Sequence, residues 1–144
     1  MAQISVRSTL IKKYRRKADL KIKNYEVRGM KESVIVDKSK AFALRIIKLY
    51  RYLCAEKQEY VLSKQLLRSG TSIGANVREA KRGQSKPDFY SKMNIALKEA
   101  DEAAYWLELL HESGFLELQA FESIYEDCNE LIKILVSILK TKTS

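Results

Sequence analysis

The sequence predicts an all-α protein, an up-down-up-down four-helix bundle that follows a basic N-terminal extension. Its 144 residues include only one proline and five glycines, the two residue types that most oppose helix formation. From Asp37 onward, apolar residues recur at spacings of three and four in four segments, as in helices that each bury one face. Short links between such segments favour antiparallel neighbours. We therefore place the extension in residues 1–32 and the bundle in residues 33–144.

Most of the positive charge belongs to the extension. Residues 1–32 contain ten Lys/Arg and three Asp/Glu, a net of +7, whereas residues 33–144 contain seventeen and fifteen, a net of +2. The extension could be a basic arm that binds phosphates, a poorly ordered tail, or an artefact of the assigned start, because Met30 could also begin the chain. The arm interpretation rests on one cluster: Lys12, Lys13, Arg15, Arg16 and Lys17.

The first bundle helix is expected to begin at Asp37 or Ser39, since either side chain can cap a helix N-terminus. It is expected to end near Glu56. Its core face consists of Phe42, Ile46, Leu49 and Leu53.

The second helix is expected to begin at Ser63 and to end at Arg82-Gly83. Its core face holds Leu66, Gly70, Ile73, Val77 and Ala80. Each glycine inside a helix costs about 1 kcal/mol relative to alanine. We therefore expect another backbone to approach closely at Gly70 and Gly74.

The third helix has the clearest boundaries. Ser85 as the cap, Pro87 in the first turn and Asp88 near the positive helix end predict its start. Gly114 can adopt the left-handed conformation that ends it. The core faces of the last two helices are Phe89, Met93, Ala96, Ala100, Ala103, Leu107 and Leu110, followed by Phe121, Ile124, Cys128, Leu131, Leu135 and Ile138.

A polar stripe lies on the second helix. It consists of Ser69, Ser72, Asn76 and Glu79, bordered by Arg68, Arg78 and Arg82. In one interpretation these side chains bond across to a neighbouring helix. In the other they form a polar groove or a subunit contact.

The third helix carries a second stripe, formed by Ile95, Glu99, Glu102, Trp106 and Leu109. A carboxylate removed from water needs a cationic or donor partner. We expect that partner to be Arg68, Arg78 or Arg82, from the same chain or from another subunit. Because both faces of this helix are partly apolar and Trp106 can anchor an interface, we expect a homo-oligomer.

Patterns for catalysis and metal binding are weak. Glu108 and His111 form a Glu-x-x-His pattern, but a di-iron bundle needs two such motifs and His111 is the only histidine. Cys54 and Cys128 are too few for a disulfide framework and lie among apolar neighbours. We expect no enzyme activity, no metal and no cofactor. Without a signal-peptide pattern or an apolar run of about 20 residues, the chain is expected to be cytoplasmic.

Residues 63–80, SKQLLRSGTSIGANVREA, resemble the signature of the bacterial 23S rRNA intervening-sequence proteins, also called four-helix bundle proteins. The similarity continues in residues 95–102, IALKEADE, and 105–110, YWLELL, and it includes FALRIIKLY at residues 42–50. It covers about residues 33–140 and leaves the extension outside.

This resemblance implies a ring-like homopentamer. Some members are encoded in insertions within large-subunit ribosomal RNA genes, and distant relatives bind a reverse transcriptase and RNA through a basic surface. No catalytic residue is implied, and the positions of the polar stripe and Arg68 transfer only as family-typical residues. We therefore predict a non-catalytic oligomer associated with RNA or a ribonucleoprotein. The alternative, favoured by the bundle's small net charge, is a homo-oligomeric protein-interaction scaffold with no nucleic-acid binding.

Overall fold

The computed structural model describes the backbone of residues 2–143 and the side chains of Lys12, Lys13, Arg16 and residues 29–142. Its helices are α1 (Ala2–Lys57), α2 (Leu62–Lys81), α3 (Lys86–Glu112) and α4 (Leu118–Lys140), and a short 3-10 turn, Thr141–Thr143, follows α4. The chain divides into two compact units, Met1–Glu32 and Ser33–Ser144.

In the first unit the described backbone is α-helical, and it belongs to α1. The start of α1 therefore differs from the prediction. Because α1 begins at Ala2, the expectation that the helix begins at Asp37 or Ser39 is wrong. Ser39 lies in the helix interior, where its Oγ donates to the carbonyl of Val36 at 3.2 Å. Residues 2–57 contain no proline, so no residue of the segment forces a helix break.

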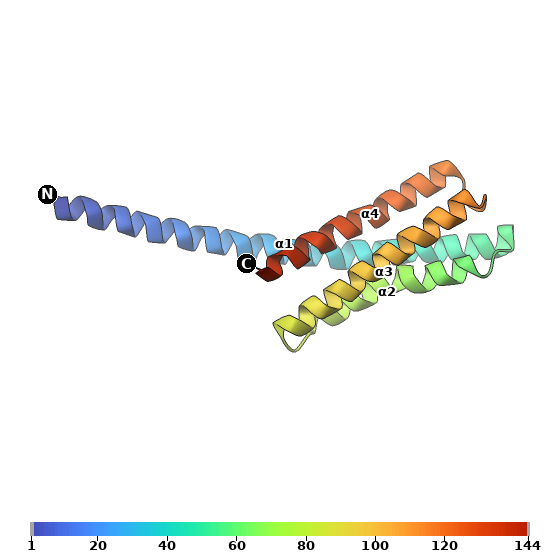
Figure 1. Cartoon of the computed structure of the whole chain (residues 1–144), viewed down its shortest axis with the longest axis horizontal. Coiled ribbons are helices and arrows are strands. Elements are labelled where there is room, and N and C mark those ends of the chain that lie inside the picture. Colours follow the sequence, from blue (N-terminus) through green and yellow to red (C-terminus); the bar gives the residue numbers. More distant parts are fainter. Residues whose placement is uncertain (1, 144) are drawn as a thin grey trace. The chain divides into compact units, whose positions relative to one another are not determined.

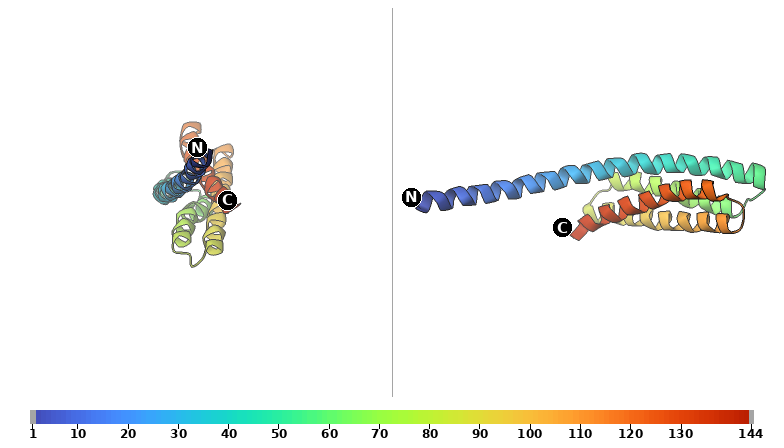
Figure 2. Two further views of the ribbon diagram at one scale, coloured as in Figure 1. Left: turned by 90° about the vertical axis from the view of Figure 1, so that its left-hand side faces the viewer. Right: turned by 90° about the horizontal axis from the view of Figure 1, so that it is seen from above.

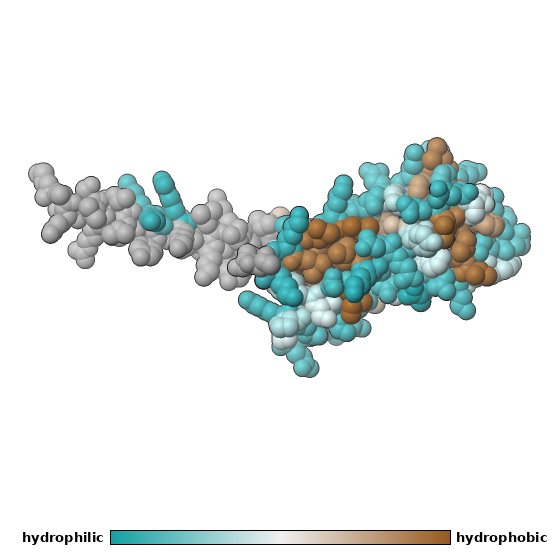
Figure 3. All heavy atoms as spheres, viewed as in Figure 1, coloured by the Kyte–Doolittle hydropathy of each residue, from teal (hydrophilic) through white to brown (hydrophobic). Residues whose placement is uncertain are grey.

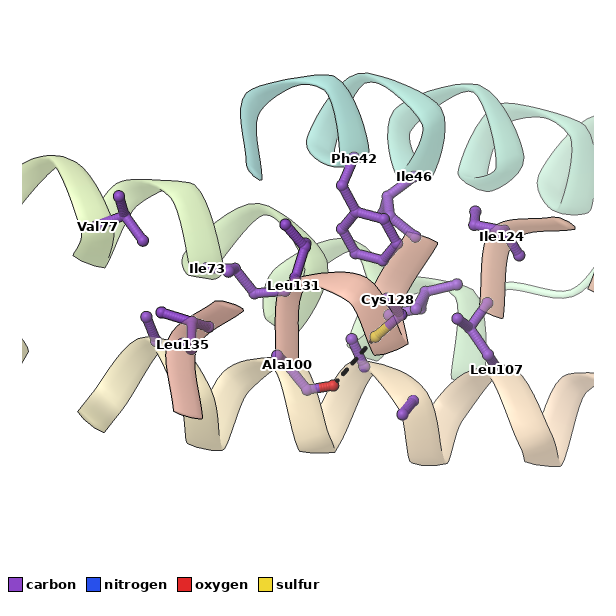
Figure 4. Packing of buried hydrophobic residues seen from close by; sticks show 14 of the residues in the cluster. Phe42, Ile46, Ile73, Val77, Ala100, Leu107, Ile124, Cys128, Leu131 and Leu135 are labelled. Atoms are coloured by element: carbon purple, nitrogen blue, oxygen red, sulfur yellow. Dashed lines mark hydrogen bonds between the residues drawn. The ribbon is translucent and has the colours of Figure 1, made fainter. Parts of the chain in front are cut away.

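The second unit is the predicted up-down-up-down four-helix bundle (Figures 1 and 2). Every helix contributes fully buried side chains to one core, and the pattern of threes and fours identifies most of them correctly. Figure 4 shows these side chains pointing inward between the helices. The largest that are almost completely buried are Ile35, Phe42, Ile46 and Leu53 of α1, Leu66 and Ile73 of α2, Met93, Leu107 and Leu110 of α3, and Leu131, Leu135 and Ile138 of α4.

The two glycines of α2 lie where α1 and α2 approach closely, as predicted. A Cβ added at Gly70 would stand 2.8 Å from Cγ1 of Ile46, and one at Gly74 would stand 3.5 Å from backbone atoms of Ser39. The neighbour at Gly70 is thus a side chain, and only Gly74 faces backbone. Both glycines allow α1 and α2 to pack at short range.

The predicted limits of α3 are confirmed. Ser85 has an extended backbone, and its side chain accepts a bond from the amide of Asp88 at 3.2 Å. At the other end, Gly114 has a φ of +88°, the left-handed conformation that glycine adopts without strain.

On the face of the bundle that Figure 3 shows, hydrophilic side chains surround a contiguous apolar patch, and further apolar areas lie toward the right of the view. Leu44, Tyr105 and Leu118 are among the exposed apolar residues. None of the helices in the described part of the chain has an apolar stretch that could span a bilayer.

Candidate functional site

The two carboxylates of the second α3 stripe have their partners within the chain. Arg68 Nη1 of α2 lies 3.3 Å from Glu99 Oε2, and Arg68 Nη2 bonds to Glu102 Oε1. Trp106 Nε1 donates to the same oxygen of Glu102 at 3.1 Å. The prediction of an arginine partner is confirmed for Arg68. Within the described part of this chain, Arg78 and Arg82 pair with neither carboxylate.

The polar stripe of α2 bonds mainly to its own helix. Ser69 donates to the carbonyl of Gln65 at 3.0 Å, Ser72 to Arg68 at 2.6 Å, and Asn76 to Ser72 at 2.8 Å. The expectation that these three side chains bond across to a neighbouring helix is therefore wrong. The side chains of serine and asparagine can donate a hydrogen bond to the backbone carbonyl four residues earlier in the same helix, so they need no partner on another helix.

Glu79 is the member of the stripe that reaches another helix. Its Oε2 lies 3.1 Å from Nζ of Lys92 on α3. Both side chains are partly exposed, so the pair is an ordinary surface salt bridge that contributes little stability.

A groove with a volume of about 530 Å³ lies between α1 and α2. Its cations are Lys40 of α1, Arg78 of α2 and Arg82, which directly follows α2. The other lining residues are Val36, Ser39, Ala43, Thr71, Gly74, Ala75 and Glu79. We call it the α1–α2 groove. Lys40 is not among the predicted site residues, because only the packing of two helices places it beside Arg78 and Arg82. Its position in a segment rich in Lys and Arg was the one available signal.

The small net charge of the bundle conceals two oppositely charged halves. Residues 33–82, which contain the bundle part of α1 and all of α2, have eleven Lys/Arg and four Asp/Glu, a net of +7. Residues 83–144, which contain α3 and α4, have six and eleven, a net of −5. Together these give the +2 of residues 33–144.

Three of the eleven cations in the basic half pair with the acidic half. Besides Arg68, Lys38 lies 2.6 Å from Glu130 and Arg45 lies 2.5 Å from Asp127. The other eight are exposed and form no ion pair with any residue that the structure describes: Lys40, Lys48, Arg51, Lys57, Lys64, Arg78, Lys81 and Arg82.

In the basic arm, the side chains of Lys12, Lys13 and Arg16 are exposed on a helical backbone. The side chains of Arg15 and Lys17 lie outside the described residues. Three exposed cations on one short helical stretch are available to bind phosphates.

Glu108 of α3 bonds to α4, and His111 of α3 bonds to the loop that joins the two helices. Tyr125 of α4 donates to Glu108 at 2.8 Å, and His111 Nδ1 lies 2.8 Å from the carbonyl oxygen of Leu116. The hydrogen bond to Glu108 raises the pKa of Tyr125, and burial raises it further by a smaller amount. The imidazole also stacks on Phe121, with ring centres 4.5 Å apart. Within the described residues, no group of three His, Cys, Asp or Glu side chains is arranged to hold a metal.

The two cysteines have different environments. Cys128 is completely buried, and its Sγ donates to the carbonyl of Ala100 at 3.3 Å (Figure 4). Burial, with the nearby charges of Asp101 and Asp127, raises the pKa of Cys128 to about 12. Cys54 is only half-buried. Cys128 is thus a buried thiol, whereas Cys54 retains partial access to solvent.

Two comparisons with known proteins give matches. The family model described as the 23S rRNA-intervening sequence protein matches residues 31–137. The chain is also similar to the crystal structure of a protein of unknown function from the S23 ribosomal protein family of Bacteroides thetaiotaomicron VPI-5482, with 55% sequence identity and a TM-score of 0.76. That similarity covers 76% of this chain and 98% of the Bacteroides chain. A comparison with curated proteins finds no match.

Proposed function

Since the chain belongs to the 23S rRNA-intervening sequence protein family, we propose that it is a cytoplasmic, non-catalytic, homo-oligomeric bundle that associates with RNA or a ribonucleoprotein. The observation that carries this proposal is a set of eight exposed cations on the α1/α2 half of the bundle, none of which forms an ion pair with a described residue. The family by itself supplies no activity, because its crystallised Bacteroides relative has unknown function.

Unpaired cations on one side of a molecule are what a polyanion requires. Each Lys or Arg that neutralises a phosphate releases condensed counterions, and this release favours binding whatever the base sequence. A net charge of +2 over the whole bundle would predict weak attraction if the charge were evenly spread. A half with a net of +7 attracts phosphates, while the acidic half faces away from them.

The test is fluorescence anisotropy of a labelled, structured RNA titrated with the full-length protein at several salt concentrations. We expect the affinity to fall steeply with salt, with a slope proportional to the number of phosphate contacts. Absence of any salt-sensitive affinity would remove the main support for the proposal.

The contribution of the basic arm is measured in the same assay with Lys12→Gln/Lys13→Gln/Arg16→Gln. Its matched control is Lys86→Gln/Lys98→Gln/Lys133→Gln, which removes the same charge from α3 and α4. If the arm binds phosphates, the arm variant has the shallower salt slope. Equal slopes in the two variants would limit phosphate contacts to the bundle.

The alternative function is a homo-oligomeric scaffold that binds no nucleic acid. It is favoured by the opposite charges of the two halves, because the basic side of one copy can face the acidic side of the next. Such head-to-tail contacts close into rings when the rotation between copies allows it. In that case the protein assembles normally and the RNA titration shows no binding.

A further inference from the structure

We propose that the α1–α2 groove binds the phosphodiester backbone of an RNA strand and that it reads charge, not base sequence. This inference rests on the proposed function. It specifies which part of the basic half contacts RNA and which part of the RNA is recognised.

The cations of the groove are free to accept an anion. Lys40, Arg78 and Arg82 are exposed and have no ion pair within the described part of the chain. Arg78 lies in the last turn of α2 and Arg82 directly follows the helix, and both line the groove. The carboxylate of the lining, Glu79, is bonded to Lys92 of α3. The positive charge in the groove is therefore largely uncompensated.

Small residues give an anion close access to these cations. Ala43, Gly74 and Ala75 line the groove between the two helices, and none of them has a side chain beyond Cβ. The two hydroxyls of the lining are already used as donors: Ser39 bonds to Val36 at 3.2 Å and Thr71 to Leu67 at 2.7 Å. Lys40 and the two arginines thus supply the donors for a phosphate.

The length of the groove favours a polymer over a single small anion. Its lining extends from Thr71 of α2 to Arg82, the residue that follows this helix, which corresponds to about 16 Å at 1.5 Å per residue. A stretch of that length accommodates several consecutive phosphates of one strand. The lining contains no aromatic side chain, so bases have no surface on which to stack. We therefore expect affinity to depend little on sequence.

The first variant tests charge. In Lys40→Gln/Arg78→Gln/Arg82→Gln, the slope of log affinity against log salt should decrease by about 2, since each phosphate contact on a single strand contributes about 0.7. The triple variant on α3 and α4, Lys86→Gln/Lys98→Gln/Lys133→Gln, should leave the slope unchanged. Thermal melting verifies that both variants are folded.

The second variant tests shape without changing charge. Ala75→Leu places a bulky side chain in the groove at an exposed position. We expect a loss of affinity of about tenfold, the effect of losing one charge-assisted contact. The matched control is Ala120→Leu, at an exposed position on α4, which should bind like the wild type. A merely solvated basic surface would respond to neither leucine.

The outcomes separate this inference from the proposed function. If the wild type binds RNA but the groove variants bind equally well, the groove is excluded and RNA association stands. If the wild type binds no RNA, and added pyrophosphate still shifts the amide NMR signals of Gly74 and Ala75, the groove is a site for small anions and both proposals fail. Absence of both signals also overturns both.

Discussion

At the residue scale, Glu59 holds the first turn of α2, a role that a search for serine caps does not detect. Its carboxylate accepts bonds from the amides of Val61, Leu62 and Ser63 at 3.1, 2.8 and 2.7 Å. In return, the hydroxyl of Ser63 donates to the carbonyl of Glu59 at 2.7 Å. The predicted start at Ser63 is thus one residue from the observed start of α2 at Leu62, but the side chain that caps the first turn is that of Glu59.

Glu59 makes stability depend on pH. Burial alone would raise its pKa, but the bonds from the amides of Leu62, Ser63 and Val61 and from the Ser63 hydroxyl together lower it below the ordinary 4.5. A group with a lowered pKa stabilises the fold above its unfolded pKa and loses that contribution as the pH falls through its folded pKa. Glu59→Gln should therefore cost about 1 kcal/mol at pH 7, as a lost cap does.

The difference between wild type and Glu59→Gln should shrink below about pH 4, where the wild-type carboxyl is protonated. Urea unfolding at pH 7 and pH 3 measures it. Glu56→Gln is the matched control, because Glu56 is exposed and, unlike Glu59, is not among the carboxylates that accept bonds from the first amides of α2 in the described structure. A difference that stays constant with pH would contradict the role of the Glu59 charge.

The side chain of Ile46 leaves no room for a side chain at position 70, so a glycine is needed there. A methyl group there would lie 2.8 Å from Cγ1 and 3.0 Å from Cγ2 of Ile46, a fully buried β-branched side chain that cannot turn away. Overpacking costs about 1–3 kcal/mol, against a gain of about 1 kcal/mol in helix propensity. Gly70→Ala should lower the midpoint of thermal unfolding, whereas Gly29→Ala, with no atom within 4 Å of the new methyl, should not. A more stable Gly70→Ala variant would show that Ile46 moves.

The two thiols should differ in reactivity. A thiolate is the reactive form, and Cys128 is buried with its pKa raised to about 12. At pH 8 we expect an aromatic disulfide reagent to modify Cys54 in the native protein and to reach Cys128 only after unfolding. Rapid modification of both thiols in the native state would mean that the bundle opens around α4.

At the scale of elements, α2 and α3 are joined through Arg68. Its side chain is half exposed, and those of Glu99 and Glu102 are 20% and 34% exposed. Solvent therefore screens the pairs, and a coupling energy of about 0.5–1 kcal/mol is expected. A double-mutant cycle with Arg68→Gln and Glu102→Gln in urea unfolding measures it. The cycle of Arg45→Gln and Asp127→Gln, which joins α1 and α4 at similar exposure, should give a comparable value.

The pattern of the sequence predicted three of the four helices well. Ser85, Pro87 and Gly114 are local signals, and they mark the ends of α3 correctly. The N-terminus of α1 was misplaced because Asp37 and Ser39 have capping side chains, and their identity does not reveal whether the preceding backbone is already helical. Local signals identify possible boundaries, and the neighbouring turns decide which are used.

The candidate site was only partly predictable, for a different physical reason. Arg68 was correctly joined to Glu99 and Glu102, because a half-buried carboxylate must find a cation nearby. Lys40 was missed because it belongs to a groove built by two helices, and a single helical pattern contains no information about the facing helix. The hydroxyls of α2 bonded to their own helix, an option that spacing alone does not distinguish from bonding across.

At the scale of the whole molecule, self-association is the most direct prediction. By resemblance to its family we expect a ring-like homopentamer. Ile95 and Tyr105, the latter next to Trp106, are exposed on α3 and are our candidates for an apolar contact between copies. Light scattering on the full-length protein should give about five times the 16.6 kDa of one chain. Ile95→Lys/Tyr105→Lys should reduce the mass, and Leu44→Lys, an exposed apolar position on α1, serves as the control. A monomeric wild type would contradict the prediction.

Charge-paired contacts between copies would respond to salt as well. If the basic half of one copy faces the acidic half of the next, raising the salt concentration should lower the mass, because the Debye length falls from about 10 Å at 0.1 M to about 3 Å at 1 M. A mass that is independent of salt would favour the apolar contact on α3.

The two oppositely charged halves of the bundle also give it an electric dipole moment. The field of a charged partner orients such a molecule before the two come into contact. In the field of a long polyanion, the torque would rotate each incoming bundle until α1 and α2 lead and α3 and α4 trail. Productive collisions would then make up a larger share of all collisions, and association would be faster than for a molecule of the same net charge spread evenly.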